Sequence, residues 1–219
     1  MTAAAPCPID RAIDPDILDL LGPELVHVTA KSNVESIVSR GLRSAADLAA
    51  EAGFSTEKLL LRRSRLRVGK ATLTHQRPLA SYYDTAEGLL TGHTPESWAA
   101  QLDRRVFFWH AREASAFSKS IARDLPVARL WFNTGILIDA LAPWLDICPL
   151  NSGSFRQGGG GKPRGDWIYV PVTRSAGDYR MNRQRHIQTK TRDTKIREIS
   201  CRISIPPDLI QRALLTENT

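Results

Sequence analysis

The sequence has few cysteines and no long hydrophobic run, and each shortage argues against a class of protein. Its three cysteines, Cys7, Cys148 and Cys201, are far apart and show no Cys-x-x-Cys spacing. Such an odd, scattered set argues against a disulfide framework and a cysteine-based zinc site, and it favours the reducing cytoplasm. No apolar stretch approaches the roughly 20 residues that span a bilayer, so we expect no membrane association. Residues 1–8 lack the basic start and apolar run of a secretory signal.

The chain has 219 residues, a length that suits one compact domain. We expect residues 1–22 to form a lead-in with a short helix, and residues 23–219 to form a single domain. Lys and Arg number 30 against 23 Asp and Glu, which gives a formal net charge of +7. This charge favours anionic partners, although a basic surface that only meets solvent explains it equally well.

The periodicity of the apolar residues predicts a mixture of strands and helices. Alternation and short apolar runs predict strands at 25–29, 106–109, 127–132, 145–150, 167–172 and 196–205. Helical spacing and capping residues predict helices at 17–21, 34–42, 44–52, 95–102, 113–123, 135–141 and 206–215. Of two basic segments, 58–70 has mainly helical propensity and 175–194 is expected to be irregular. Because strands and helices mix without regular βαβ spacing, we expect an α+β fold with a mainly antiparallel sheet.

The last predicted strand carries a carboxylate on its polar side. One face holds Arg197, Ile199, Cys201, Ile203 and Ile205, and the other holds Glu198, Ser200, Arg202 and Ser204. The apolar face should pack on the core, so Glu198 should point away from it. From this position alone, a solvated surface carboxylate in a salt bridge is the simpler interpretation of Glu198.

The first predicted strand divides in the same way. Leu25, His27 and Thr29 share one face, and Val26 and Val28 share the other. A lone histidine on a strand is more often structural than functional. Two strands from opposite ends of the chain, each with a polar face, can nevertheless border one cleft. We therefore expect His27 and Glu198 to meet in one cleft, on neighbouring strands.

Three parts of the sequence resemble known families. Leu25–Leu42, LVHVTAKSNVESIVSRGL, is similar to the opening of DarT-type DNA ADP-ribosyltransferases, where a strand with His and Thr precedes an Asn and a helix. Ile196–Leu209, IREISCRISIPPDL, is similar to their final segment, where the catalytic glutamate begins a strand that closes at a proline. Between them, Arg104–Trp109 (RRVFFW), Leu150–Gly153 (LNSG) and Pro163–Gly165 (PRG) resemble an uncharacterised bacterial family that shares the DarT-like opening.

This resemblance implies an ADP-ribosyltransferase-like fold, with a central, mainly antiparallel split sheet and flanking helices. It implies an enzyme that uses NAD as co-substrate without a metal, and it makes Glu198 the catalytic residue. Loss of nicotinamide from NAD gives an oxocarbenium-like transition state, as in glycoside cleavage. A fixed carboxylate stabilises that cation and can accept the proton of the incoming nucleophile.

The same resemblance implies NAD-binding roles for other residues. His27 and Thr29 would contact the adenosine half of NAD, and Asn33 would lie beside the same pocket. Arg62 and Arg63 are the counterparts of an arginine set against the NAD phosphates, because a guanidinium fork suits that role. The choice between them and the nearby Arg65 and Arg67 stays open, as does a role as a plain basic helix face.

Aromatic residues offer a further element of such a site. Tyr82 or Tyr83 would supply an aromatic wall for nicotinamide, and core packing is equally consistent with either. Four other aromatic residues are assigned to the core: Trp98, Phe107, Phe108 and Trp109.

The acceptor is expected to be a nucleic acid, and the resemblance alone favours DNA. The segment 174–195 leads directly into Glu198 and carries the basic residues Arg180, Arg183, Arg185, His186, Lys190 and Arg192. Such a run can hold phosphates without reading sequence, although a solvated loop fits equally well. Gly158–Gly161 is not a P-loop, because no Gly-Lys-Ser/Thr follows it.

Three functions are consistent with these patterns. The favoured one is an NAD-dependent ADP-ribosyltransferase that modifies nucleic acid, as a toxin or defence protein with a neutralising antitoxin or ADP-ribose hydrolase as partner. The first alternative is a protein-directed ADP-ribosyltransferase or an NAD glycohydrolase. The second is a non-enzymatic nucleic-acid-binding module on this fold, which the presence of both His27 and Glu198 disfavours.

Overall fold

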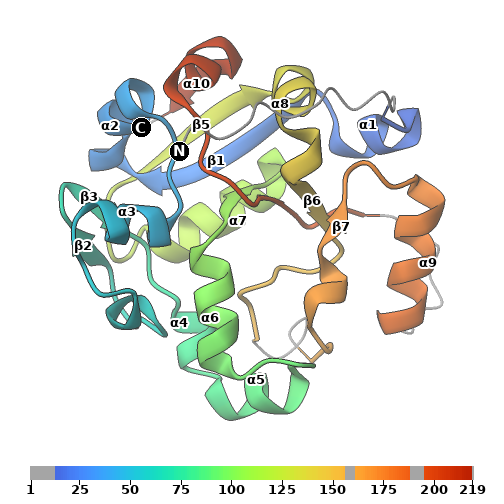
Figure 1. Cartoon of the computed structure of the whole chain (residues 1–219), viewed down its shortest axis with the longest axis horizontal. Helices are drawn as coiled ribbons and strands as arrows, with labels where there is room; N and C mark the ends of the chain where they lie inside the picture. Colours follow the sequence, from blue (N-terminus) through green and yellow to red (C-terminus); the bar gives the residue numbers. More distant parts are fainter. Residues whose placement is uncertain (1–12, 156–160, 188–194, 219) are drawn as a thin grey trace, which may run out of the picture.

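The computed structural model describes residues 13–155, 161–187 and 195–218 (Figure 1). The strands are β1 (Glu24–Ala30), β2 (Leu66–Val68), β3 (Ala71–Leu73), β4 (Val106–Phe108), β5 (Val127–Asn133), β6 (Leu145–Cys148), β7 (Val170–Pro171), β8 (Glu198–Cys201) and β9 (Leu214–Asn218). The α-helices are α1 (Pro15–Leu21), α2 (Val34–Arg40), α3 (Ala45–Glu51), α4 (Arg77–Ala80), α5 (Tyr83–Leu89), α6 (Pro95–Asp103), α7 (Ala111–Ile121), α8 (Thr134–Leu141), α9 (Ala176–Ile187) and α10 (Pro207–Ala213). Short 3-10 helices are η1 (Lys31–Asn33), η2 (Thr56–Leu59), η3 (Ala142–Trp144) and η4 (Asp166–Ile168).

The named strands form two main sheets and one hairpin, and every pair of them is antiparallel. One sheet has the order β1-β5-β9, the other has the order β4-β8-β6-β7, and β2 pairs with β3. The two main sheets meet where Val26 of β1 and Trp109 exchange backbone hydrogen bonds of 2.8 and 2.9 Å. The expected α+β class, with antiparallel sheets and flanking helices, is confirmed.

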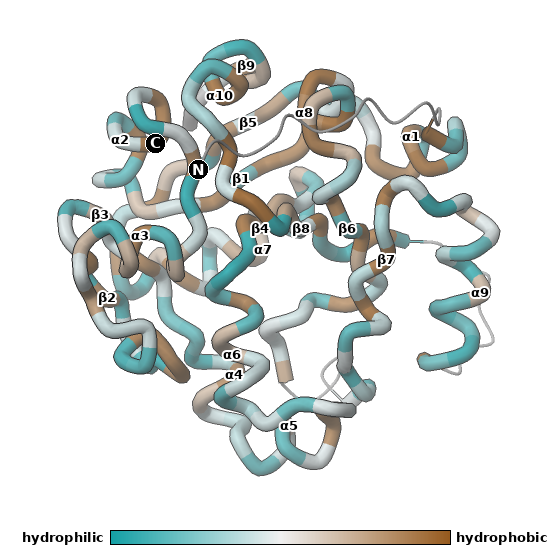
Figure 2. The backbone as a smooth tube through the Cα atoms, in the orientation of Figure 1, coloured by the Kyte–Doolittle hydropathy of each residue, from teal (hydrophilic) through white to brown (hydrophobic). Residues whose placement is uncertain are grey.

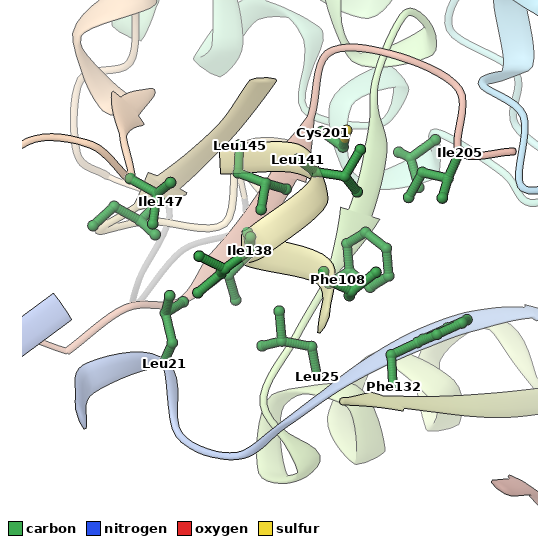
Figure 3. Packing of buried hydrophobic residues seen from close by; sticks show 14 of the residues in the cluster. Leu21, Leu25, Phe108, Phe132, Ile138, Leu141, Leu145, Ile147, Cys201 and Ile205 are labelled. Atoms are coloured by element: carbon green, nitrogen blue, oxygen red, sulfur yellow. The ribbon is translucent and has the colours of Figure 1, made fainter. Parts of the chain in front are cut away.

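The largest core cluster lies between the two main sheets and is closed by α8 and α10. Figure 3 shows Ile138 and Leu141 of α8 among side chains from both sheets. Phe108 of β4 meets Phe132 of β5 edge to face, with ring centroids 5.7 Å apart. In Figure 2, β1, β5 and α8 are mainly hydrophobic, whereas α9 is mainly hydrophilic. The buried apolar area therefore joins the two sheets into one body.

Side chains alternate across the β4-β8-β6 sheet, and this places the polar ones together. Ile199 and Cys201 pack in the core cluster, as the sequence predicts, and Glu198 and Ser200 occupy the opposite face. The strand is shorter than predicted, because β8 ends at Cys201. Ile205, also predicted to belong to it, forms only an isolated bridge with Leu42. The last predicted helix is likewise shorter, since α10 gives way to β9, which pairs with β5.

Both predictions for the basic segments are wrong. Residues 58–70 contain η2 and β2 in place of a longer helix, because Gly69 (φ 55°) makes the tight turn that pairs β2 with β3. Residues 176–187 form helix α9 and are not irregular. Its start is fixed by Ser175, whose Oγ accepts a hydrogen bond from the Asp178 amide (3.0 Å), while the Asp178 carboxylate accepts one from the Ser175 amide (3.4 Å).

Some predictions concern residues outside the described ranges. These are the lead-in at 1–12, most of the Gly158–Gly161 run, Lys190 and Arg192. None of the helices in the described ranges combines the length and the apolar character needed to cross a membrane.

Gly41 ends α2 at a position where no side chain fits, which gives a test of this fold. Its φ is 90°, and an added Cβ would overlap the carbonyl oxygen of Ile205. Gly53 has a similar φ of 62° but nothing within 4 Å of the same position. We expect Gly53→Ala to lower the free energy of unfolding by about 1 kcal/mol, from backbone strain alone. Gly41→Ala should lower it by at least about 3 kcal/mol, because the backbone must also shift. Urea unfolding measures both, and equal losses would contradict this packing of α2.

Candidate functional site

A cavity of about 520 Å³ lies against the polar face of the β4-β8-β6 sheet and extends to β1, β3, α2 and α7. Its walls include residues from both ends of the chain. Those used below are His27, Thr29, Asn33, Arg62, Thr72, Arg105, Phe107, Trp109, Phe117, Ser152 and Glu198.

Glu198 lines this cavity although it is only 3% exposed. Its Oε1 accepts two hydrogen bonds from Ser152, one from Oγ at 2.6 Å and one from the backbone amide at 3.2 Å. Burial raises the pKa of Glu198 to about 7, while the Ser152 donors and the cations Arg164 and Arg105 oppose that rise. The expectation of a solvated surface carboxylate is therefore wrong. A carboxylate with this pKa can both carry charge and accept a proton near neutral pH.

The loop that carries Ser152 is organised by a buried arginine. Arg164 is 1% exposed, and it donates hydrogen bonds to the backbone oxygens of Asn151 (3.1 Å) and Ser154 (2.6 Å). Its guanidinium also lies 4.6 Å from the centre of the Phe155 ring. Burial lowers the pKa of Arg164 to about 10, so the side chain stays charged at neutral pH. Arg164 thus fixes the backbone on both sides of Ser152.

Arg164 and Ser152 were not predicted as site residues. The sequence did single out their motifs, Leu150–Gly153 and Pro163–Gly165, but only as features of a resemblance. In the structure the two motifs are joined directly, since the arginine of the second bonds to the backbone of the first. Trp98 adds a third anchor, because its Nε1 donates to the Ser152 carbonyl at 3.0 Å.

A second, half-buried arginine lies beside Glu198 on the same sheet face. Arg105 donates to the Asp146 carboxylate at 2.6 Å and to the Ser200 hydroxyl at 2.9 Å. Its guanidinium carbon lies 3.7 Å from the centre of the Tyr169 ring. The polar face that the alternation predicts for Glu198 and Ser200 is therefore a hydrogen-bonded network, and its cation is paired with Asp146.

His27 lies on the cavity wall in a fixed tautomer. Its Nδ1 lies 2.8 Å from the carbonyl oxygen of Phe107, and a carbonyl only accepts, so Nδ1 carries the proton. Burial lowers the pKa of His27 to about 4, which keeps the ring neutral at pH 7. Nε2 is then a hydrogen-bond acceptor that a hydroxyl group of a ligand can satisfy.

The predicted meeting of His27 and Glu198 in one cleft is confirmed, since both line this cavity. The expectation that their strands are neighbours is wrong. β8 pairs with β4 and β6, and β4 lies between β8 and β1. The physical reason is that the two sheets join through Val26 and Trp109, so the C-terminal strand reaches β1 only across β4.

Thr29 and Asn33 line the cavity, but Asn33 has a structural task there. Its Oδ1 accepts a hydrogen bond from the Thr72 amide (2.9 Å), and its Nδ2 donates to the Thr72 carbonyl (2.8 Å). Nδ2 also lies 3.1 Å from Thr29 Oγ1, which accepts from it. Asn33 therefore fastens η1 to β3, and Thr29 keeps its own hydroxyl proton to donate.

Arg62 is the one arginine of the predicted 62–67 group that lines the cavity. Its Nη1 bonds to both carboxylate oxygens of Asp103, at 2.8 and 2.9 Å, and its Nε donates to the Thr74 carbonyl at 2.6 Å. Its Nη2 has no hydrogen-bond partner among the described residues. Arg62 is thus held rigidly, with one nitrogen left to contact a ligand.

The remaining predicted site residues lie away from the cavity. Arg63 is exposed and donates to the Ala80 carbonyl at 3.3 Å, and Tyr82 is 36% exposed. Neither residue lines the cavity, and neither do three arginines of helix α9: Arg180, Arg183 and Arg185.

Three aromatic residues line the cavity, and one of them, Trp109, is also buried in a core cluster, as expected. Phe107, Trp109 and Phe117 of α7 line the cavity. The ring centroid of Trp109 lies 6.2 Å from that of Phe107 and 4.5 Å from that of Phe117. Phe108 and Trp98 are fully buried in the core, as expected. Applying the period of two to 106–109 would have separated Phe107 and Trp109 from Phe108.

Within the described residues, no group of three or more His, Cys, Asp or Glu side chains is placed to hold a metal ion.

The sequence matches the family of unknown function DUF7002 over residues 23–211, and the chain therefore belongs to that family. No curated protein matches it.

The burial of Glu198 predicts a pH-dependent stability. Because its pKa rises from 4.5 to about 7 on folding, the unfolded chain loses this proton at lower pH than the folded chain. The contribution of Glu198 to the free energy of unfolding therefore falls as the pH rises through that window, and it is constant above it. Glu198→Gln has no such proton. We expect the wild type to lose about 3 kcal/mol relative to Glu198→Gln between about pH 4 and about pH 8. Urea unfolding of both proteins across this range tests it, and a difference independent of pH would contradict the assignment.

Proposed function

We propose that this protein is an NAD-dependent ADP-ribosyltransferase, and that Glu198 is its catalytic carboxylate. The observation that carries the proposal is the buried Glu198, held by Ser152 in the same cavity as His27. The antiparallel, divided sheet agrees with the ADP-ribosyltransferase-like fold that the resemblance implies. A protein that made no use of this carboxylate would be more stable with a neutral residue there, because burying an ionisable group costs free energy.

The chemistry follows from the two oxygens of Glu198. Oε1 accepts both hydrogen bonds from Ser152, so Oε2 is the oxygen that can face the ribose of the nicotinamide half. The glycosidic bond to nicotinamide breaks with its electron pair leaving on the nicotinamide nitrogen. The carboxylate then stabilises the positive charge that develops on the ribose. When the acceptor attacks, the same carboxylate accepts its proton.

His27 and the aromatic wall support this orientation of the substrate. The Nε2 of a neutral imidazole accepts a hydrogen bond, and a ribose hydroxyl of NAD can donate it. Thr29 can donate a hydrogen bond to the same adenosine half of NAD. Phe107, Trp109 and Phe117 form a stacked aromatic cluster in the cavity wall, which suits contact with an aromatic ring such as nicotinamide or adenine. Arg62, whose Nη2 has no hydrogen-bond partner in the described ranges, is the candidate contact for the NAD phosphates.

We place the acceptor among nucleic acids, with DNA favoured by the resemblance alone. The net charge of +7 supports an anionic acceptor. A toxin or defence role would require a neutralising antitoxin or an ADP-ribose hydrolase as partner. Incubation with NAD and separate DNA, RNA and protein acceptors distinguishes these classes, because each modified product gains the mass of ADP-ribose. Cleavage of NAD without any labelled acceptor would identify an NAD glycohydrolase.

Nicotinamide release tests the catalytic role of Glu198. We expect Glu198→Gln to reduce the rate by at least about 100-fold, because the nearly isosteric amide lacks both the charge and the basicity. Glu87→Gln is the matched control, since Glu87 is exposed on α5 and does not line the cavity. Its rate should equal that of the wild type. Wild-type turnover in a well-folded Glu198→Gln variant would remove Glu198 from the mechanism.

A further inference from the structure

The segment 58–70 is a concentration of positive charge with no acidic residue. Its cations are Lys58, Arg62, Arg63, Arg65, Arg67 and Lys70. Arg62 turns inward to Asp103, and the other five side chains are exposed. The segment therefore presents five positive charges to solvent, while the charge of Arg62 is paired with Asp103 in the cavity wall.

A strained residue lies directly before the inward arginine. Leu61 has a φ of 53°, a conformation that non-glycine residues rarely adopt. Gln76 stabilises this backbone conformation with two hydrogen bonds. Its side-chain oxygen accepts one from the backbone amide of Leu61 (2.8 Å), and its backbone amide donates one to the carbonyl oxygen of Arg62 (2.7 Å). The direction in which Arg62 and Arg63 leave the chain is thus fixed by hydrogen bonds on both sides of the strained residue.

The outward arginines are anchored without being neutralised. Arg65 donates to the carbonyl oxygen of Asp124 at 3.0 Å, and Arg67 donates to that of Gly69 at 3.4 Å. None of the five exposed cations forms an ion pair with a described residue, whereas Arg77 close by is paired with the Asp124 carboxylate at 2.8 Å. Backbone carbonyls orient a guanidinium but leave its net charge in place, so the segment keeps a fixed positive field.

This charge lies at the edge of the cavity. Arg67 of β2 is the register partner of Thr72 of β3, and cross-strand partners share one face of a hairpin. Thr72 lines the cavity, so Arg67 lies one strand away from the cavity wall, on the exposed side of the hairpin. Arg65 lies just before β2, where it bonds to Asp124, and Lys70 lies in the turn between β2 and β3. Helix α9, where the sequence suggested the acceptor would bind, contributes no residue to the cavity and lies on the other side of the molecule from the hairpin (Figure 1).

We propose that the exposed cations Arg65, Arg67 and Lys70, in the β2–β3 hairpin and the residue just before it, hold the phosphates of a single-stranded nucleic acid whose next base enters the cavity. That this nucleic acid is the acceptor of ADP-ribose rests on the proposed function, but that it binds to this surface does not. A base can reach Glu198 only when it is unpaired, because a stacked and paired base stays inside a duplex. The half-buried ring of Phe107, which stacks on Trp109 in the cavity wall, then offers the base a stacking surface.

A nucleic acid fits this surface better than an anionic membrane. Membrane-binding surfaces combine positive charge with exposed apolar side chains that insert between lipids. The exposed large hydrophobic residues of the described chain are Leu18, Tyr82, Met181 and Leu215, and none belongs to 58–70. The surface is therefore charged without an apolar anchor, which is the pattern of phosphate-backbone binding.

Salt-dependent binding of a fluorescent single-stranded DNA oligonucleotide, without NAD, tests the proposal. The test variant is Arg65→Gln/Arg67→Gln/Lys70→Gln. The matched control is Arg174→Gln/Arg180→Gln/Arg185→Gln, which removes three exposed charges from α9 and the residues before it. We expect the hairpin variant to bind at least about 10-fold more weakly and to reduce the salt slope by about 2, since each phosphate contact contributes about 0.7 for single strands. The control should bind like the wild type, and thermal unfolding should show both variants folded.

The outcomes separate this proposal from the proposed function. Equal weakening in both variants, or a greater effect of the α9 variant, overturns it. Wild-type binding to phosphatidylserine vesicles with none to the oligonucleotide also overturns it, in favour of a membrane surface. Nicotinamide release by a wild type that binds no oligonucleotide leaves the NAD chemistry standing while this surface assignment fails. Hairpin-dependent binding by a wild type that never cleaves NAD supports the surface and overturns the enzyme.

Discussion

The burial of one carboxylate constrains the whole site. Glu198 is buried at the start of β8. A carboxylate without hydrogen-bond partners there would lower the free energy of unfolding by several kcal/mol. Ser152 offsets part of that cost with two donors on one oxygen. Oε2 accepts no hydrogen bond from the part of the chain that the structure describes, and burial still raises the pKa of Glu198. The hydrogen bonds from Ser152 make the burial of Glu198 compatible with folding, and a pKa of about 7 lets the carboxylate exchange a proton near neutral pH.

Keeping Ser152 in place requires a second buried ion. The loop 151–154 has no regular secondary structure, so its backbone needs partners from elsewhere in the chain. Arg164 satisfies carbonyls on both sides of Ser152, and Trp98 satisfies the carbonyl of Ser152 itself. An arginine is suited to this because its planar fork donates in several fixed directions. The position of the carboxylate thus depends on residues separated from it by 34 positions or more along the chain.

The sequence predicted what depends on local patterns. Caps and periodicity located most helices and strands, and the alternation of 196–205 placed Glu198 on the face away from the core. The same alternation could not predict that this face is buried, because the residues that cover it come from irregular segments around Ser152 and Arg164. Asn33 shows the reverse case. Its place beside the cavity followed from the resemblance, but its bonds to Thr72 depend on a hairpin whose first strand falls in the segment 58–70, which has mainly helical propensity.

The measurement that tests the central claim most directly is the titration of Glu198 by carbon NMR, with Glu198→Gln used to assign its carboxyl signal. The account predicts an apparent pKa near 7 in the protein alone and a shift in that titration when NAD is added, because the substrate ribose would lie against Oε2. A carboxyl that titrates near its ordinary value of 4.5 and does not respond to NAD would contradict the account.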